Sequence, residues 1–182
     1  MKRRAFRGSS PITAVVFFGV FTLGPWAVPG ALATGSAATC SLDITLHLTP
    51  GLTLKSGSGT ISSGEAAGSL NCVGFIAGQL VTGPGQFRVA GTYGGTVLQG
   101  GTSGRASYSV PTVSGPRGGT VNYVVTWLTD AGFITVQDNV YGNGVGPFLY
   151  LPNGTGLTGP VTTIRWVSQH IVFGSGAPTG GS

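Results

Sequence analysis

The stretch SLDITLHL, residues 41–48, alternates strictly between polar and apolar side chains. Every second residue is leucine or isoleucine, and the residues between them are serine, aspartate, threonine and histidine. A period of two is typical of a strand that packs one face on a core and turns the other to solvent. The stretch therefore predicts a half-buried β-strand. The sequence Thr49-Pro50-Gly51 that follows it favours a turn.

Short apolar runs separated by glycine and proline continue to about residue 173. Turn residues recur roughly every 8 to 12 residues, a spacing typical of all-β folds. Residues 121–129 carry valine, tyrosine, valine and tryptophan at alternate positions, which predicts a central strand. A tight turn at 129–132 would pair it with an antiparallel strand at 133–138. In residues 161–173 the apolar positions change parity, which predicts a bulge near residues 166–168.

The expected fold is therefore all-β: a single antiparallel β-sandwich of immunoglobulin-like character, with one disulfide, over residues 34–173. Residues 174–182 contain no large apolar side chain and predict a flexible tail. Glycine accounts for 34 of the 182 residues, against about 7 percent in average proteins. We interpret the glycine-rich stretches at 92–96 and 100–104 as turns, because they lack the lysine and the strand-to-helix context of a phosphate-binding loop. No cofactor is expected.

The first 33 residues resemble an export signal in their composition. Four basic residues stand within the first seven, an apolar stretch runs from about residue 11 to 28, and Ala31 and Ala33 offer the small side chains that signal peptidase prefers. We therefore expect residues 1–33 to be a signal peptide and the protein to be secreted, either outside the cell or in its envelope. The pair Arg3-Arg4 would also suit twin-arginine export, but the general secretory route is favoured.

The charge of the chain changes when this leader is set aside. The whole sequence has a formal net charge of +5, whereas residues 34–182 carry five basic and four acidic side chains, a net charge of +1. The five cations are scattered, so the sequence predicts no nucleic-acid binding. After the leader there is no further apolar stretch of about 18 residues, so no membrane span is expected in the mature chain.

Two cysteines, Cys40 and Cys72, both follow the leader. In an oxidising compartment such a pair predicts a disulfide. Closing a loop of about 33 residues would stabilise the fold by roughly 3.5 to 4 kcal/mol in the chain-entropy description. The alternative is two buried free thiols, and neither cysteine has the Cys-x-x-Cys spacing of a metal site.

Ionisable residues are few enough that candidates for catalysis can be examined one by one. Asp43 and His47 lie four positions apart on the first expected strand, roughly 13 Å at about 3.3 Å per residue, so they form no dyad. His170 could act with Asp130 or Asp138 only if folding brings them together, which leaves an extracellular hydrolase as an alternative. No nucleophile elbow of the Gly-x-Ser-x-Gly type occurs.

Residues 138–144 are rich in asparagine and glycine and contain one aspartate. This composition is only superficially that of a calcium loop, because the Asp-x-Asx-x-Asx-Gly spacing is absent and there is one formal charge. We therefore interpret the stretch as a hairpin loop and expect no metal site.

Aromatic residues cluster in the last third of the chain. Tyr141, Tyr150 and Trp166 are the candidates for ligand-facing side chains, because exposed coplanar rings are how many carbohydrate-binding domains stack on sugars. The sequence does not decide between such a platform and a place for these rings in the core.

The order of Cys40, the stretch 49–54 (TPGLTL), Cys72-Val73-Gly74 and then glycine- and threonine-rich strands resembles small secreted β-proteins of actinobacteria that have no assigned activity. The resemblance covers about the first half of the chain after the leader. It implies an exported β-protein and transfers no site residue.

Together these observations predict a secreted, non-enzymatic structural or interaction protein of the cell envelope or the medium, with a protein or a cell-wall polymer as partner. A carbohydrate-binding β-sandwich module and, less favoured, an extracellular hydrolase are the alternatives.

Overall fold

The computed structural model describes residues 37–138 and 142–174. The leader, Tyr141 and all of the expected tail except Gly174 lie outside these residues. Strands account for most of the described chain and no helix occurs in it. The strands are β1 (Ala37–Leu52), β2 (Gly57–Ser62), β3 (Gly68–Ile76), β4 (Gln79–Leu80), β5 (Gly85–Gly95), β6 (Gln99–Val110), β7 (Arg117–Leu128), β8 (Ala131–Asp138), β9 (Gly142–Pro152) and β10 (Val161–Gly174).

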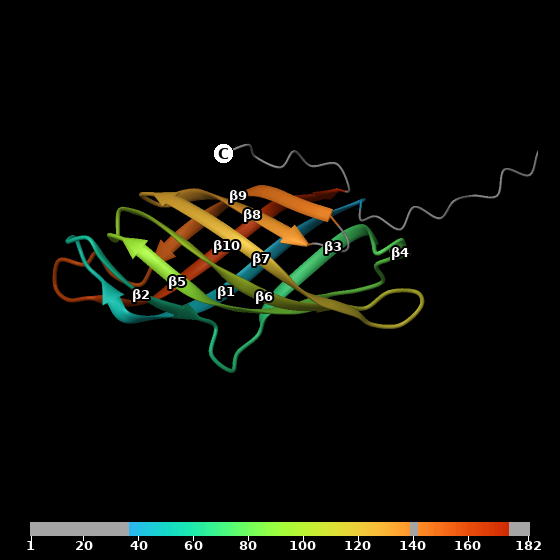
Figure 1. The fold of residues 1–182 in the computed structure, drawn as a ribbon, viewed down its shortest axis with the longest axis horizontal. Coiled ribbons are helices and arrows are strands. Elements are labelled where there is room, and N and C mark those ends of the chain that lie inside the picture. The colour runs from blue at the N-terminus through green and yellow to red at the C-terminus, as the bar shows by residue number, and fades with distance from the viewer. Residues whose placement is uncertain (1–36, 139–141, 175–182) are drawn as a thin grey trace, which may run out of the picture. The chain divides into compact units, whose positions relative to one another are not determined.

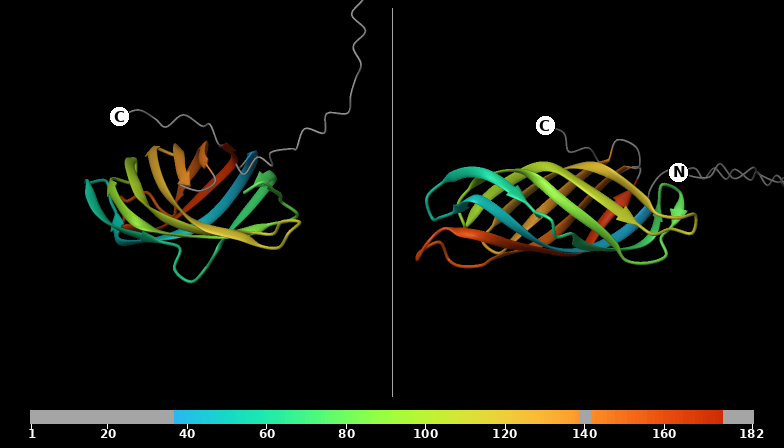
Figure 2. Two further views of the ribbon diagram at one scale, coloured as in Figure 1. Left: turned by 45° about the vertical axis from the view of Figure 1, so that its right-hand side comes forward. Right: turned by 90° about the horizontal axis from the view of Figure 1, so that it is seen from below.

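All ten strands belong to one antiparallel sheet, and this sheet closes on itself (Figure 1). From β5 to β10 each strand pairs with the next one along the chain, and β10 then pairs with β1. Strands β2 and β3 both pair with β1 and with β5, at different ends of these longer strands. Both strands therefore lie between β1 and β5 in the closed sheet. Figure 2 shows the strands wrapping around a common interior.

The predicted all-β antiparallel fold with one disulfide is confirmed. The immunoglobulin-like detail is not confirmed, since hydrogen-bonded pairing continues around the whole sheet. The hairpin predicted after residue 128 is present, with Leu128 opposite Ala131 and a two-residue turn between them. The sheet leaves few unpaired strand edges, because its first and last strands are joined.

The pairing of β1 with β10 brings together residues more than 100 positions apart. Ile44 lies opposite Trp166 and Leu46 opposite Ile164, and all four side chains point into the interior. On the outer surface, Arg165 donates two hydrogen bonds to the carboxylate of Asp43, and this lowers the pKa of that carboxyl. The ion pair is solvent-exposed and therefore adds little stability of its own. The line along which β1 and β10 pair, which we call the seam, depends on backbone hydrogen bonds and on the apolar side chains beneath it.

Strand β10 contains the predicted bulge. Cys40 pairs with Ile171 and Leu42 with Ser168, so one residue of β1 faces two residues of β10. The extra residue lies at positions 169–170, just after the predicted place. It lets Ser168 and Ile171 both turn inward, although they are three positions apart.

The prediction of a turn at Thr49-Pro50-Gly51 is wrong. Strand β1 continues through these residues to Leu52, with a cis peptide bond between Thr49 and Pro50. The carbonyl of Pro50 accepts a hydrogen bond from the Tyr93 hydroxyl, which reaches it from β5. Proline followed by glycine favoured a chain reversal. Here both residues lie within one long strand, at a place where its register with β10 shifts.

The glycine-rich stretches are also not mainly turns: most of their residues lie within β5 and β6. Gly100 in the second stretch, and Gly91 just before the first, face large rings across a crowded interior. A Cβ atom added at Gly91 would lie 2.5 Å from the Tyr123 hydroxyl, and one at Gly100 would lie 2.5 Å from the Trp127 ring. Interiors of small closed sheets are often filled by such alternation of large and small residues. Further close approaches to rings involve Gly68 with Phe87, Gly132 with Phe148 and Gly144 with Phe173.

This packing makes a prediction for two glycines of the same strand. Gly91→Ala should lower the free energy of unfolding by about 1 to 3 kcal/mol, because the added methyl group overpacks the interior. Gly94→Ala is the matched control, since a Cβ there has no heavy atom within 4 Å, and it should change stability by less than about 1 kcal/mol. Urea unfolding followed by tryptophan fluorescence measures both variants. Equal effects would contradict the proposed role of the inward glycines.

Candidate functional site

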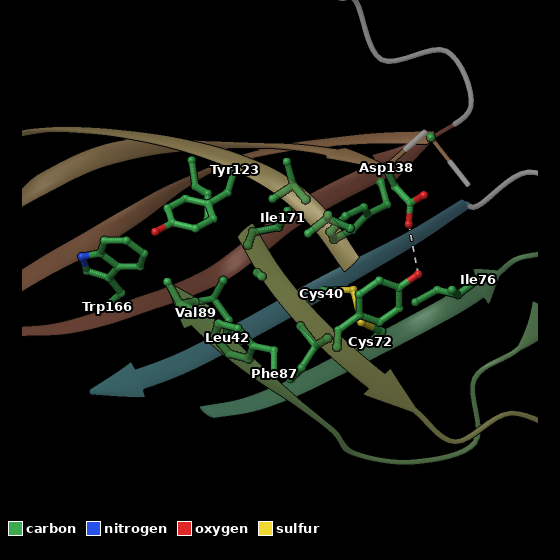
Figure 3. Close-up of a pocket in the computed structure, with 18 residues that line it drawn as sticks. Cys40, Leu42, Cys72, Ile76, Phe87, Val89, Tyr123, Asp138, Trp166 and Ile171 are labelled. Atoms are coloured by element: carbon green, nitrogen blue, oxygen red, sulfur yellow. Dashed lines mark hydrogen bonds between the residues drawn. A yellow bond between two sulfur atoms is a disulfide. The ribbon is translucent and has the colours of Figure 1, made fainter. Parts of the chain in front are cut away.

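An apolar cavity of about 70 Å³ lies inside one end of the closed sheet (Figure 3). Side chains from β1, β3, β5, β6, β7, β8 and β10 line it, and most are aliphatic or aromatic. The disulfide between Cys40 and Cys72 forms part of its wall. These cysteines pair directly across β1 and β3, so the predicted disulfide is confirmed and also borders the cavity.

The two ends of the cavity differ in exposure. Trp166 and Tyr123 form the inner end and are almost fully buried, with their rings edge to face at a centroid distance of 6.0 Å. Asp138, Tyr108 and Phe173 line the other end and are only partly buried. Figure 3 shows Asp138 and Trp166 at opposite ends of the lining. Among the described residues the end near Asp138 is the more exposed one, and we call this end the mouth.

The lining carries polar groups at both ends, Tyr108 and Asp138 at the mouth and Tyr123 and Trp166 at the inner end. The Tyr108 hydroxyl donates a hydrogen bond of 3.1 Å to Oδ2 of Asp138. At the inner end the Trp166 indole nitrogen lies on the side turned away from Asp138 (Figure 3). Burial raises the pKa of the Tyr123 hydroxyl, and the neighbouring Thr102 offsets part of that rise. The wall between the two ends is apolar.

The predicted ligand-facing aromatics do not form an exposed platform. Tyr150 is 0% exposed and Trp166 is 1% exposed, because both occupy inward positions of their strands. Tyr150 stacks on Trp127 at a centroid distance of 5.1 Å and an angle of 6°. Of the two alternatives that the sequence left open, these two residues therefore occupy the core, while Tyr141 lies outside the described residues. Trp166 does face a cavity, but from within the sheet.

The histidine and carboxylates considered for hydrolysis do not come together. His170 is exposed on β10, whereas Asp138 lines the interior cavity. The carbonyl of Asp130 accepts a hydrogen bond from the Tyr150 amide, while the backbone of His170 lies against Gly146, four residues earlier on β9. That spacing corresponds to roughly 13 Å along the strand. Neither pairing gives one substrate access to both groups.

Within residues 37–138 and 142–174 no group of three or more histidine, cysteine, aspartate or glutamate side chains is placed to hold a metal ion. The same residues contain no helix that is long and apolar enough to cross a membrane.

The outer surface has a mainly polar part and a part with exposed apolar side chains. Serine, threonine and charged side chains dominate the outer faces of β1, β2, β5 and β6. On β7, β8 and β9 several large apolar side chains are exposed instead. They lie in neighbouring positions of paired strands and comprise Val124, Leu128, Phe133, Val145 and Leu149.

Comparison with known proteins gives no relative from which a function could be transferred: no family model, no curated protein and no solved structure matches the chain.

Sequence reasoning missed the cavity and did not single out Tyr108. A signal was present, because Ala106, Tyr108 and Val110 stand at alternate positions of one strand, which places the Tyr108 ring on the inner face. Asp138 was considered only as a partner of His170 or as a calcium ligand. Its inward direction depends on the pairing of β7, β8 and β9, which no local pattern specifies.

Two buried tyrosines provide a test of how the interior is packed. Among the described residues the Tyr150 hydroxyl has no hydrogen-bond partner, whereas the Tyr93 hydroxyl donates to the Pro50 carbonyl. Tyr93→Phe should therefore lower the free energy of unfolding by about 0.5 to 1.5 kcal/mol. Tyr150→Phe should leave it unchanged or raise it, because a buried, unpaired hydroxyl is unfavourable. Thermal unfolding monitored by circular dichroism measures the difference, and an equal loss in both variants would contradict this packing.

Proposed function

We propose that the protein is a secreted, non-enzymatic binding protein that holds a small apolar ligand, or the apolar end of a larger one, in the cavity within its closed sheet. The observation that carries the proposal is the continuous apolar lining between the Trp166 ring and the partly exposed mouth at Asp138. Pockets for small molecules are typically concave and apolar, with a few polar groups that fix orientation. The cavity and its mouth have this arrangement.

The volume of the cavity limits what can enter. At about 70 Å³ it is smaller than the pockets of roughly 300 to 1,000 Å³ that enclose drug-sized ligands. It is about half the size of an engineered apolar cavity of about 150 Å³ that binds benzene or xenon. We therefore expect a ligand whose buried part is a narrow group of a few heavy atoms.

The surrounding structure favours a lasting cavity over one that collapses. Its wall includes the Cys40–Cys72 disulfide, and the rings at its inner end are held edge to face, Trp166 against both Tyr123 and Phe148. Closely packed interiors change shape little, because each side chain is confined by its neighbours. The separation of His170 from Asp130 and Asp138 supports binding over hydrolysis.

The proposed compartment rests on the leader and on the disulfide. A disulfide persists in oxidising surroundings, which suits an extracellular or envelope protein. Scattered cations and a net charge of +1 after the leader support a role away from nucleic acid.

A second candidate function is contact with a protein or a cell-wall polymer. The observation that favours it is the exposed apolar group on β7, β8 and β9, with Leu128 at 66% and Phe133 at 63% exposure. Clustered apolar side chains on a surface commonly mark interaction sites. Contact of this kind is compatible with a ligand inside the sheet.

Filling the cavity tests the proposed function. Ala106 lies on its wall, and Ala90 is exposed on the neighbouring strand β5, so Ala106→Leu and Ala90→Leu are a matched pair. Xenon and butan-1-ol are suitable probes, because both are small and apolar enough to enter. In NMR titrations both should shift signals of residues around the cavity in the unmodified protein and in Ala90→Leu. Ala106→Leu should weaken this binding at least tenfold.

Unfolding measurements on the same samples show whether Ala106→Leu remains folded. If neither probe shifts signals of the cavity residues in the unmodified protein, the proposed function is wrong. Equal binding by folded Ala106→Leu would place the probes elsewhere and would also contradict it.

A further inference from the structure

We infer that the exposed apolar surface on β7, β8 and β9 receives a second copy of this chain, so that the protein forms a twofold-symmetric dimer. The partner named here rests on the second proposed function, contact through this surface, and is independent of the cavity. We call the outward residues of segments 124–128 on β7, 131–135 on β8 and 145–149 on β9 the β7–β9 face.

The outward residues of this face repeat on either side of β8, which lies between β7 and β9 (Figure 1). Two rows of directly paired residues cross the three strands: Val124 with Thr135 and Val145, and Leu128 with Ala131 and Leu149. Each row has the same apolar residue at both ends. Phe133 stands between the two rows, on the middle strand.

This arrangement is complementary to itself. A twofold axis that lies in the interface and runs along β8 places β7 of each copy on β9 of the other. Leu128 then meets Leu149, and Val124 meets Val145. Phe133 meets the same residue of the second copy. A twofold contact uses one surface twice, so a surface whose apolar residues match in this way suits it.

The size of the face is that of a stable interface. Its five large exposed apolar residues expose roughly 550 Å², at the upper end of the patches of about 300 to 600 Å² found on monomers. With the smaller exposed residues between them, the face offers roughly 800 Å², the area that each partner of a standard complex buries. A second protein surface would cover all of it.

A groove of about 650 Å³ lies over the same face, with Phe133, Pro147 and Val167 among the residues that line it. It is open to solvent on the outside of the sheet, because Phe133 and Pro147 are exposed. Small-molecule sites enclose most of the ligand's surface. A small molecule in this groove would remain largely in water, so the groove suits side chains of a covering protein better.

Charge favours a copy of the chain over a different protein. Among the described residues, no outward side chain of the β7–β9 face is charged. A symmetric contact brings equal charges together, so an uncharged face avoids repulsion. Homodimer interfaces are also more apolar than those between different proteins. Asp130 and the ion pair of Arg165 with Asp43 lie at the edge of the face, where interfaces are usually polar.

Sedimentation of the purified, disulfide-bonded protein tests self-association. The protein should be dimeric at about 100 μM and should dissociate on dilution through the micromolar range. Because no charged pair lies within the contact, the dissociation constant should change less than about threefold between about 50 and about 500 mM salt.

Phe133→Asp tests the place of the contact, because it sets two carboxylates against each other at the axis. It should raise the dissociation constant at least a hundredfold. Phe75→Asp is the matched control, since Phe75 is also exposed on its strand, β3, but lies outside the face. It should leave the dissociation constant unchanged. Circular dichroism checks that both variants fold.

A pair of leucine variants tests the direction of the axis and decides the matter if Phe133→Asp does not fold. Leu128→Lys and Leu149→Asp should each weaken self-association at least tenfold, because each sets a charge against leucine. An equimolar mixture should associate at least tenfold more tightly than either variant alone, since the lysine of one then meets the aspartate of the other. A mixture no tighter than the single variants would contradict this geometry.

The outcomes separate the dimer from the proposed contact function. A protein that is monomeric at about 100 μM, a folded Phe133→Asp that dimerises as before, or an equal loss in Phe75→Asp overturns the dimer. If the monomeric protein binds purified cell-wall fractions and Phe133→Asp abolishes this binding, the contact function stands with another partner. If neither a dimer nor wall binding is found, the contact function fails as well. Ala106→Leu tests the cavity separately.

Discussion

The structure depends on one constraint: a sheet that closes on itself encloses a fixed interior, and the side chains of every strand must share it. Aliphatic side chains and large rings share this space, and glycines on facing or neighbouring strands leave room for several of the rings. Gly100 beneath Trp127 and Gly91 beside the Tyr123 hydroxyl are examples. Several glycines within the strands therefore reflect packing and not turns. Between Trp166 and Asp138 the interior remains partly unfilled and becomes the cavity.

Much of the fold could be predicted from the sequence, because the alternation of polar and apolar residues along a strand indicates which of them face the core. The strand at 41–48, the hairpin after residue 128 and the bulge in the last strand are all present, the bulge close to its expected place. Closure was not predictable in this way. Pairing of Ile44 with Trp166 joins residues far apart in the sequence, and an open and a closed sheet have the same period of two.

The glycine-rich stretches show why the remaining interpretation failed. Glycine in a strand pattern lowers β-propensity and is common in turns, so residues 92–96 and 100–104 were interpreted as breaks. Gly100 is needed inside its strand because the Trp127 ring of β7 occupies the space of a Cβ atom, and no local pattern contains that information. The same reason hid the candidate site, since Tyr108 and Asp138 meet only after β6 and β8 have taken their places around the interior.

The seam between β1 and β10 is the most direct place to test this account, because the enclosed interior exists only if these strands pair. Solution NMR should show backbone contacts between Ile44 and Trp166 and between Leu46 and Ile164, as strong as those between Cys40 and Cys72 on the β1–β3 side. Absence of the seam contacts, with those between β1 and β3 present, would mean that the sheet is open and would contradict both the packing and the cavity described above.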